Sequence, residues 1–120
     1  MINSYFFDTY ALIELHNANP NYEKYKGAAI ITTKMNLMEF HFGVLREMGK
    51  YVADIQMGNL NNFVVEFDLD QIKFANHLKY KFRKLSYIDC LGYIVALNNG
   101  VPFVTGDEGF KELPNVEFKK

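Results

Sequence analysis

The sequence predicts an α/β protein with a largely parallel sheet, because short apolar segments alternate with helical segments along the chain. The helical segments place apolar residues three or four positions apart, and Ser86 and Asp68 stand where helix N-caps are expected. Of the 120 residues, 49% are hydrophobic and 22% are charged, the balance of a folded globular protein. This length predicts one domain spanning residues 1–120.

The expected elements follow in order. A strand at residues 5–7 runs into a helix that the Asn- and Pro-containing residues 17–21 end, and a short polar helix follows at 22–27. Four to five strands are expected in all, at residues 5–7, 28–33, 64–67, 102–105 and, at an edge, 116–118. The remaining helices are expected at residues 36–49, 52–63, 71–82 and 87–98, with a short helical turn after Gly106.

Composition excludes several classes of protein. The single cysteine, Cys90, permits no internal disulfide, and no apolar run approaches the roughly 18 residues of a membrane span. No basic-then-apolar leader begins the sequence, so we expect a cytoplasmic protein. The net charge of −1 does not by itself indicate a nucleic-acid binder.

Four acidic residues stand where a parallel α/β sheet places functional groups. Asp8 directly follows the first predicted strand, and Asp107 follows the fourth. Glu39 and Asp89 lie within or at the start of helices. Functional residues of such sheets lie at the carboxyl ends of the strands, so these acids are candidates for one site.

Four converging carboxylates would repel one another unless a cation lay among them. An all-oxygen ligand set favours hard cations such as Mg²⁺ or Mn²⁺. A cation of this kind activates water and stabilises the leaving oxygen in phosphodiester cleavage.

Each acid also has a purely structural interpretation. Asp8 is a suitable N-cap, and Asp89 fits a capping box that starts at Ser86. Thr105 and Glu108 could form another capping box, with Asp107 as a first-turn acid. Glu39 lies in mid-helix, where the alternative is a partly exposed side chain.

Four segments resemble the PIN domain family and, within it, the VapC-type toxins of toxin–antitoxin pairs. They are Phe6-Phe7-Asp8-Thr9-Tyr10-Ala11-Leu12, Asn36-Leu37-Met38-Glu39-Phe40, Leu85-Ser86-Tyr87-Ile88-Asp89-Cys90-Leu91 and Phe103-Val104-Thr105-Gly106-Asp107-Glu108-Gly109-Phe110. Their order and spacing match the family over nearly the whole chain.

The resemblance implies a three-layer α/β/α fold and an Mg²⁺- or Mn²⁺-dependent endoribonuclease, a phosphodiester hydrolase acting on single-stranded or structured RNA. It implies a homodimer and an antitoxin partner whose tail covers the site. It implies Asp8, Glu39, Asp89 and Asp107 as metal-binding catalytic acids, with Thr9 and Thr105 in support. Many relatives carry a further Asp where this chain has Gly109, a difference that bears on any second metal.

Alternatives remain beside the nuclease hypothesis. One is a catalytically weak or inactive module of the same fold that binds RNA or protein. A phosphotransferase with an Asp8 nucleophile is disfavoured, because Tyr10 stands where a second Asp is needed. The basic and aromatic segment 79–84 could bind RNA phosphates or be a solvated helix end; its cations are Lys79, Lys81, Arg83 and Lys84.

Overall fold

A four-stranded parallel sheet forms the centre of the computed structural model, which describes residues 4–120. The first three residues of the predicted domain therefore lie outside the described part. The strands are β1 (Ser4–Phe7), β2 (Ala29–Ile31), β3 (Phe103–Thr105) and β4 (Val116–Phe118). Their spatial order is β2-β1-β3-β4, and every neighbouring pair is parallel. The predicted parallel sheet of four to five strands is confirmed, and all four strands point their carboxyl ends toward the same edge.

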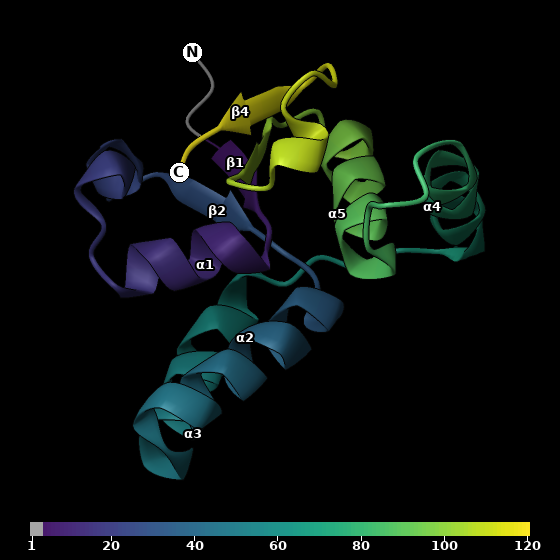
Figure 1. The fold of residues 1–120 in the computed structure, drawn as a ribbon. Helices are drawn as coiled ribbons and strands as arrows, with labels where there is room; N and C mark the ends of the chain where they lie inside the picture. The colour runs from purple at the N-terminus through teal and green to yellow at the C-terminus, as the bar shows by residue number, and fades with distance from the viewer. Residues whose placement is uncertain (1–3) are drawn as a thin grey trace.

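Helices cover both faces of this sheet (Figure 1). They are α1 (Thr9–His16), α2 (Lys34–Met48), α3 (Lys50–Leu60), α4 (Leu69–Lys81) and α5 (Tyr87–Asn98). Helix α1 packs on β1, β3 and α2, whereas α5 packs on β1 and β3 and carries α4 on its outer side. Three short 3₁₀ helices complete the chain: η1 (Pro20–Tyr25), η2 (Asn61–Phe63) and η3 (Glu108–Phe110). The three-layer α/β/α architecture is therefore confirmed.

Two apolar cores lie on opposite faces of the sheet. Successive residues of a strand point to opposite faces, so Phe6 joins the core under α5 while Phe7 joins the core under α1 and α2. Phe103 and Val104 on β3 divide in the same way, and the Phe6 and Phe103 rings stack 5.6 Å apart. These buried strands leave the carboxyl edge of the sheet as the place where polar side chains collect.

One predicted strand is wrong. Residues 64–67 form no strand of the sheet; Val64 makes only an isolated parallel bridge with Thr32. Two backbone hydrogen bonds fix this crossing, from Thr32 N–H to Phe63 and from Val65 N–H to Thr32. The chain then leaves the sheet to reach Asp68, which caps α4 in a capping box with Gln71. The segment is apolar because it packs beside the core, not because it pairs as a strand.

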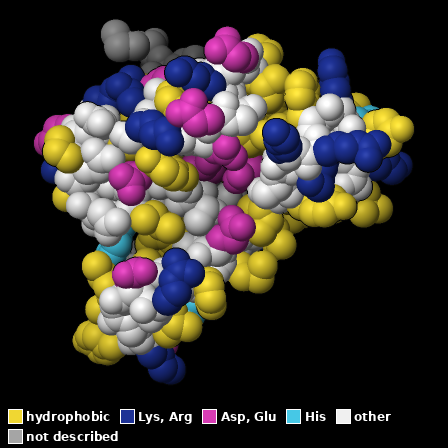
Figure 2. Space-filling model, viewed as in Figure 1, with side chains coloured by type: hydrophobic (Ala, Val, Ile, Leu, Met, Phe, Trp, Pro, Cys, Tyr) yellow, Lys and Arg dark blue, Asp and Glu magenta, His cyan; other side chains and the backbone are white. Residues whose placement is uncertain are grey.

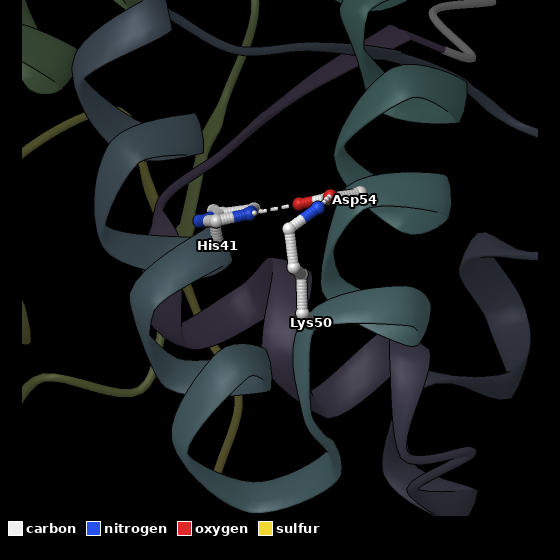
Figure 3. Close-up of polar contacts among 3 residues, drawn as sticks. All are labelled: His41, Lys50 and Asp54. Carbon is white, nitrogen blue, oxygen red and sulfur yellow. Dashed lines mark hydrogen bonds and ion pairs between the residues drawn. The ribbon is translucent and has the colours of Figure 1, made fainter.

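Helices α2 and α3 form an antiparallel hairpin that projects from the sheet (Figure 1). Gly49 joins them with a φ of 88°, a conformation that glycine adopts without steric cost. Asp54 on α3 accepts a hydrogen bond from Lys50 at 2.6 Å and contacts the His41 ring of α2 at 2.8 Å (Figure 3). His41 thus has a structural role in the hairpin. Within residues 4–120, no helix is both long enough and apolar enough to cross a membrane.

Candidate active site

Asp8 is the most deeply buried carboxylate at the carboxyl edge of the sheet. It directly follows β1 and is 1% exposed. Its Oδ1 accepts a hydrogen bond from the Ala11 N–H at 2.8 Å, so the predicted N-cap of α1 is present. Its Oδ2 accepts a hydrogen bond from the Thr105 hydroxyl at 2.5 Å. Asp8 thus caps α1, and its second carboxylate oxygen is held by β3 at the carboxyl edge of the sheet.

The Thr105 hydroxyl connects Asp8 with Asp107. Thr105 ends β3, and its hydroxyl also accepts a hydrogen bond from the Asp107 N–H at 3.0 Å. Asp107 itself caps η3, because its Oδ1 accepts from the Gly109 N–H at 2.9 Å. The alternative in which Thr105 and Glu108 form a capping box is therefore wrong. Thr105 ends β3, and its hydroxyl joins the Asp8 carboxylate to the backbone of Asp107.

Glu39 is held by a chain of side-chain hydrogen bonds across α1 and α2. The Thr9 hydroxyl donates to Glu39 Oε1 at 2.6 Å, and Asn36 Nδ2 donates to the Thr9 hydroxyl at 3.3 Å. The Thr33 hydroxyl in turn donates to Asn36 Oδ1 at 2.7 Å, and both Thr33 and Asn36 are fully buried. The half-buried Glu39 carboxylate is thus oriented by three other side chains.

Asn36 is a functional candidate that the sequence analysis missed. It lies three residues before Glu39, so the two side chains share one face of α2. A polar residue at this spacing, just inside a Thr33 cap, was the available signal. Its importance depends on Thr9, which comes from another helix, so the sequence alone gave no reason to single it out.

Asp89 lies in the first turn of α5 and is half-buried. Its N–H donates to the Ser86 hydroxyl at 3.0 Å, as predicted for the N-cap. Within the described chain only this half of the predicted capping box forms, although the Ser86 side chain also lowers the pKa of the Asp89 carboxyl.

The four predicted acids influence one another electrostatically. Burial raises the pKa of the Asp8 carboxyl from 3.8 to about 7, and the charges of Asp89 and Asp107 add to this rise. The Thr105 and Ala11 hydrogen bonds act in the opposite direction. Burial also raises the pKa of Asp89 to about 6, with a contribution from Glu39 and Asp107. Perturbed carboxylates that share one edge of a sheet are a typical sign of a functional site.

Acidic side chains gather at the centre of the face in Figure 2, where α1, α2 and α5 come together in Figure 1. None of the ion pairs found within residues 4–120 includes Asp8, Glu39, Asp89 or Asp107. Nor does any group of three His, Cys, Asp or Glu side chains in this part of the chain have a geometry that could hold a metal ion. The donor chemistry suits a hard cation, but the acids are not drawn around one point.

Gly109 occupies the position where the resembling family often has another acid. A Cβ atom placed on Gly109 would lie 2.7 Å from Leu85 Cδ2 and 3.3 Å from Asp107 Oδ1. Leu85 is 3% exposed and belongs to the core under α5. The space beside Asp107 is therefore filled by an apolar side chain.

The basic segment lies at the end of α4, apart from the acids. Lys79 donates hydrogen bonds to the Arg83 and Leu85 carbonyl oxygens at 3.1 and 2.7 Å, contacts that hold the loop after α4. Lys81 lies over the Phe82 ring at 5.5 Å, and Lys84 is exposed. Arg83 lies over the Tyr80 ring at 5.0 Å.

Comparisons with known proteins agree with this architecture. Three solved structures share the fold, and each is under 20% identical in sequence to this chain. A toxin–antitoxin complex from Klebsiella pneumoniae has a chain with a TM-score of 0.76 at 16% identity, covering 94% of this chain and 95% of that one. VapBC2 from Rickettsia felis, bound to a DNA fragment from its promoter, has a TM-score of 0.72 at 18% identity, covering 98% of this chain and 99% of that one. PAE2754 from Pyrobaculum aerophilum has a TM-score of 0.72 at 19% identity, covering 98% of this chain and 92% of that one.

No curated protein matches the chain in sequence. The family model of the PIN domain, however, matches residues 5–116, which include all four acids and both supporting threonines. The chain therefore belongs to the PIN domain family.

Proposed function

We propose that this PIN domain is a metal-dependent endoribonuclease that cleaves RNA, with single-stranded RNA as its simplest substrate. The observation that carries the proposal is the buried Asp8 carboxylate, whose pKa is raised to about 7 beside the charges of Asp89 and Asp107. A buried carboxylate without a cationic partner is costly, and a bound cation would offset that cost.

In this proposal Asp8, Glu39, Asp89 and Asp107 hold Mg²⁺ or Mn²⁺. Such a cation supplies an activated water and neutralises charge on the phosphodiester. Thr105 holds the Asp8 carboxylate in place, with its hydroxyl 2.5 Å from Oδ2. Thr9 orients Glu39 through the 2.6 Å hydrogen bond.

A second candidate is a module of the same fold that binds RNA or protein without cleaving. Two observations favour it: Gly109 replaces an acid, and no three acids of the described chain are arranged to hold a metal.

We further propose that the chain acts as the toxin of a toxin–antitoxin pair and forms a homodimer. One structural neighbour is a toxin–antitoxin complex, and another is described as VapBC2 bound to promoter DNA. The α2–α3 hairpin exposes large apolar side chains, including Phe42 at 60% and Tyr51 at 78%. Exposed apolar groups of this kind mark surfaces that other proteins cover.

Cleavage of a labelled single-stranded RNA by the purified chain tests the proposal. Reactions contain Mn²⁺, Mg²⁺ or EDTA, and the variants are Asp8→Asn and the matched control Asp70→Asn, an exposed acid on α4. We expect metal-dependent cutting that falls on the order of a hundred- to a thousand-fold in Asp8→Asn and is unchanged in Asp70→Asn.

Cutting that persists in EDTA, or that is equal in Asp8→Asn, would contradict the nuclease proposal. RNA binding without any cutting would instead support the binding module.

A further inference from the structure

A cavity of about 530 Å³ lies between the end of α4 and the start of α5, outside the acidic site. Five residues line it: Asn76, Lys79, Tyr80, Arg83 and Tyr87. Its volume is within the 300–1,000 Å³ that is usual for small-molecule and cofactor sites. The site formed by the four acids uses none of these residues.

Two tyrosine rings in this cavity are exposed to solvent. Tyr80 is 76% exposed and Tyr87 is 68% exposed. The Arg83 guanidinium lies 5.0 Å from the centre of the Tyr80 ring, and Lys79 Nζ lies 4.8 Å from the centre of the Tyr87 ring. Each ring is therefore held in place by a cation. Because neither ring is buried in the core, a flat ligand can stack on it.

The positive charge of the cavity is not neutralised by the protein. None of the ion pairs found within residues 4–120 includes Lys79 or Arg83. Lys79 holds the loop after α4 through its bonds to two carbonyl oxygens, which fixes its position and leaves its charge in place. Arg83 is thus the cation best placed to bind an anion, and its planar guanidinium suits a phosphate group.

Tyr87 of this cavity and Asp89 of the acidic site both lie in the first turn of α5, where their side chains leave the helix on different sides. Tyr87 and Asp89 are two residues apart in that turn, about 3 Å along the helix axis. Lysine and arginine side chains gather over α4 in Figure 2, beside the acidic group at the centre of the same face. A strand of nucleic acid could therefore contact both places at once.

We propose that the cavity is a nucleotide subsite, which stacks an unpaired RNA base on the Tyr80 and Tyr87 rings and holds an adjacent phosphate on Arg83. The nucleotide belongs to the strand whose phosphodiester the acids cleave, so the inference rests on the proposed function. Aromatic rings interleaved with cations are typical of single-strand recognition. Protein interfaces also use tyrosine and arginine, but two cations without an acidic partner in the described chain favour a polyanion over a protein surface.

Binding of RNA, measured without cleavage, tests the subsite. Fluorescence anisotropy in EDTA gives the affinity of the full chain for a labelled single-stranded RNA at several salt concentrations. We expect Tyr80→Leu and Tyr87→Leu each to weaken binding about 5-fold or more while leaving the salt dependence unchanged. Arg83→Gln should reduce the slope of log K against log salt by about 0.7, the value for one phosphate contact on a single strand.

Matched controls lie elsewhere on the chain. Phe74→Leu removes a ring that is 57% exposed on α4 but does not line the cavity, and Lys26→Gln removes a charge next to η1. Both should bind RNA like the parent protein. Thermal unfolding of each variant confirms that the fold is retained. Quenching of a 2-aminopurine base in the RNA, lost in Tyr80→Leu and Tyr87→Leu, gives a second readout of stacking.

Equal RNA affinity and equal salt slope in all three cavity variants would overturn the subsite. If the parent still cuts RNA with metal, the proposed function stands and the cavity is left for a protein partner. If the parent neither binds nor cuts RNA, both proposals fail.

Discussion

Asp8 and Glu39 both accept a hydrogen bond from a threonine hydroxyl, yet the fold holds them in different ways. Asp8 follows a buried strand, and two groups fixed by the backbone of α1 and β3 hold its short side chain. Glu39 lies in the middle of α2 on a longer side chain, and its position depends on Thr9, Asn36 and Thr33. The first acid is placed by the sheet, whereas the second is placed by a network of side chains.

This difference has an energetic consequence. Asp8 is 1% exposed and its ionised form is disfavoured by burial, whereas Glu39 retains contact with solvent. Most of the electrostatic cost of the site therefore arises from Asp8 at the strand end. Glu39 on the helix depends instead on neighbouring side chains for its orientation. Each of the following experiments changes one side of this contrast.

The largest expected effect is on stability. Because the pKa of Asp8 is raised from 3.8 to about 7, the folded state binds more protons than the unfolded state between these values. Stability is therefore highest below pH 4 with respect to this group, and falls as the pH rises to about 7, by about 4 kcal/mol. Asp8→Asn cannot ionise, so without metal at pH 8 it should be more stable than the parent by up to this amount.

Urea unfolding from pH 4 to pH 8 measures this effect. The stability of Asp8→Asn should still fall with pH, but by less, because the pKa of Asp89 is raised to about 6. Glu39→Gln should retain the full fall, because Asp8 still ionises. A parent protein whose stability does not fall over this range would show that Asp8 is not the costly group.

The next effect concerns the cation. Binding to the folded state alone stabilises a protein by about 2.7 kcal/mol at a hundred times the Kd. We expect Mn²⁺ to raise the melting temperature of the parent at pH 8, where Asp8 is ionised. Asp8→Asn and Glu39→Gln should lose this rise, while Asp70→Asn keeps it. An equal rise in all four proteins would place the cation elsewhere.

A smaller effect is expected from the network around Glu39. Asn36→Ala removes the acceptor of the buried Thr33 hydroxyl and the donor to the Thr9 hydroxyl, so it should destabilise the fold by about 1–3 kcal/mol. Loss of an orienting group beyond the ligands typically costs 10- to 100-fold in metal affinity or activity. We expect cleavage to fall by that factor, with higher Mn²⁺ concentrations restoring part of it.

The matched control for this network is Asn62→Ala, an exposed residue whose loss should change stability by no more than about 0.5 kcal/mol. Cleavage that is unchanged in a folded Asn36→Ala protein would show that Glu39 needs no orientation from α1.

The sequence predicted what depends on local pattern. The alternation of apolar and helical segments, the caps at Asp8, Asp68 and Ser86, and the parallel sheet were all readable from residues close in the chain. Residues 64–67 have the composition of a strand, but pairing depends on distant neighbours, and only Val64 reaches one.

The sequence also predicted those parts of the candidate site that depend on local pattern. Asp8 and Asp107 were placed correctly at strand ends, because topology fixes those positions. Asn36 was missed because its partner Thr9 lies on another helix. The cavity near Tyr80 depends on how α4 meets α5, which no spacing within either segment reveals.

The contact between Gly109 and Leu85 restricts how this chain could change over evolutionary time. An aspartate at position 109 would bring a Cβ to 2.7 Å from a side chain that is 3% exposed. The Leu85 atom in this contact is the far end of a flexible side chain, so Leu85 would have to turn to another rotamer within the packed core under α5. The acid content of this corner of the site is thus tied to the packing of one core leucine, and a fifth acid enters more easily when positions 85 and 109 change together.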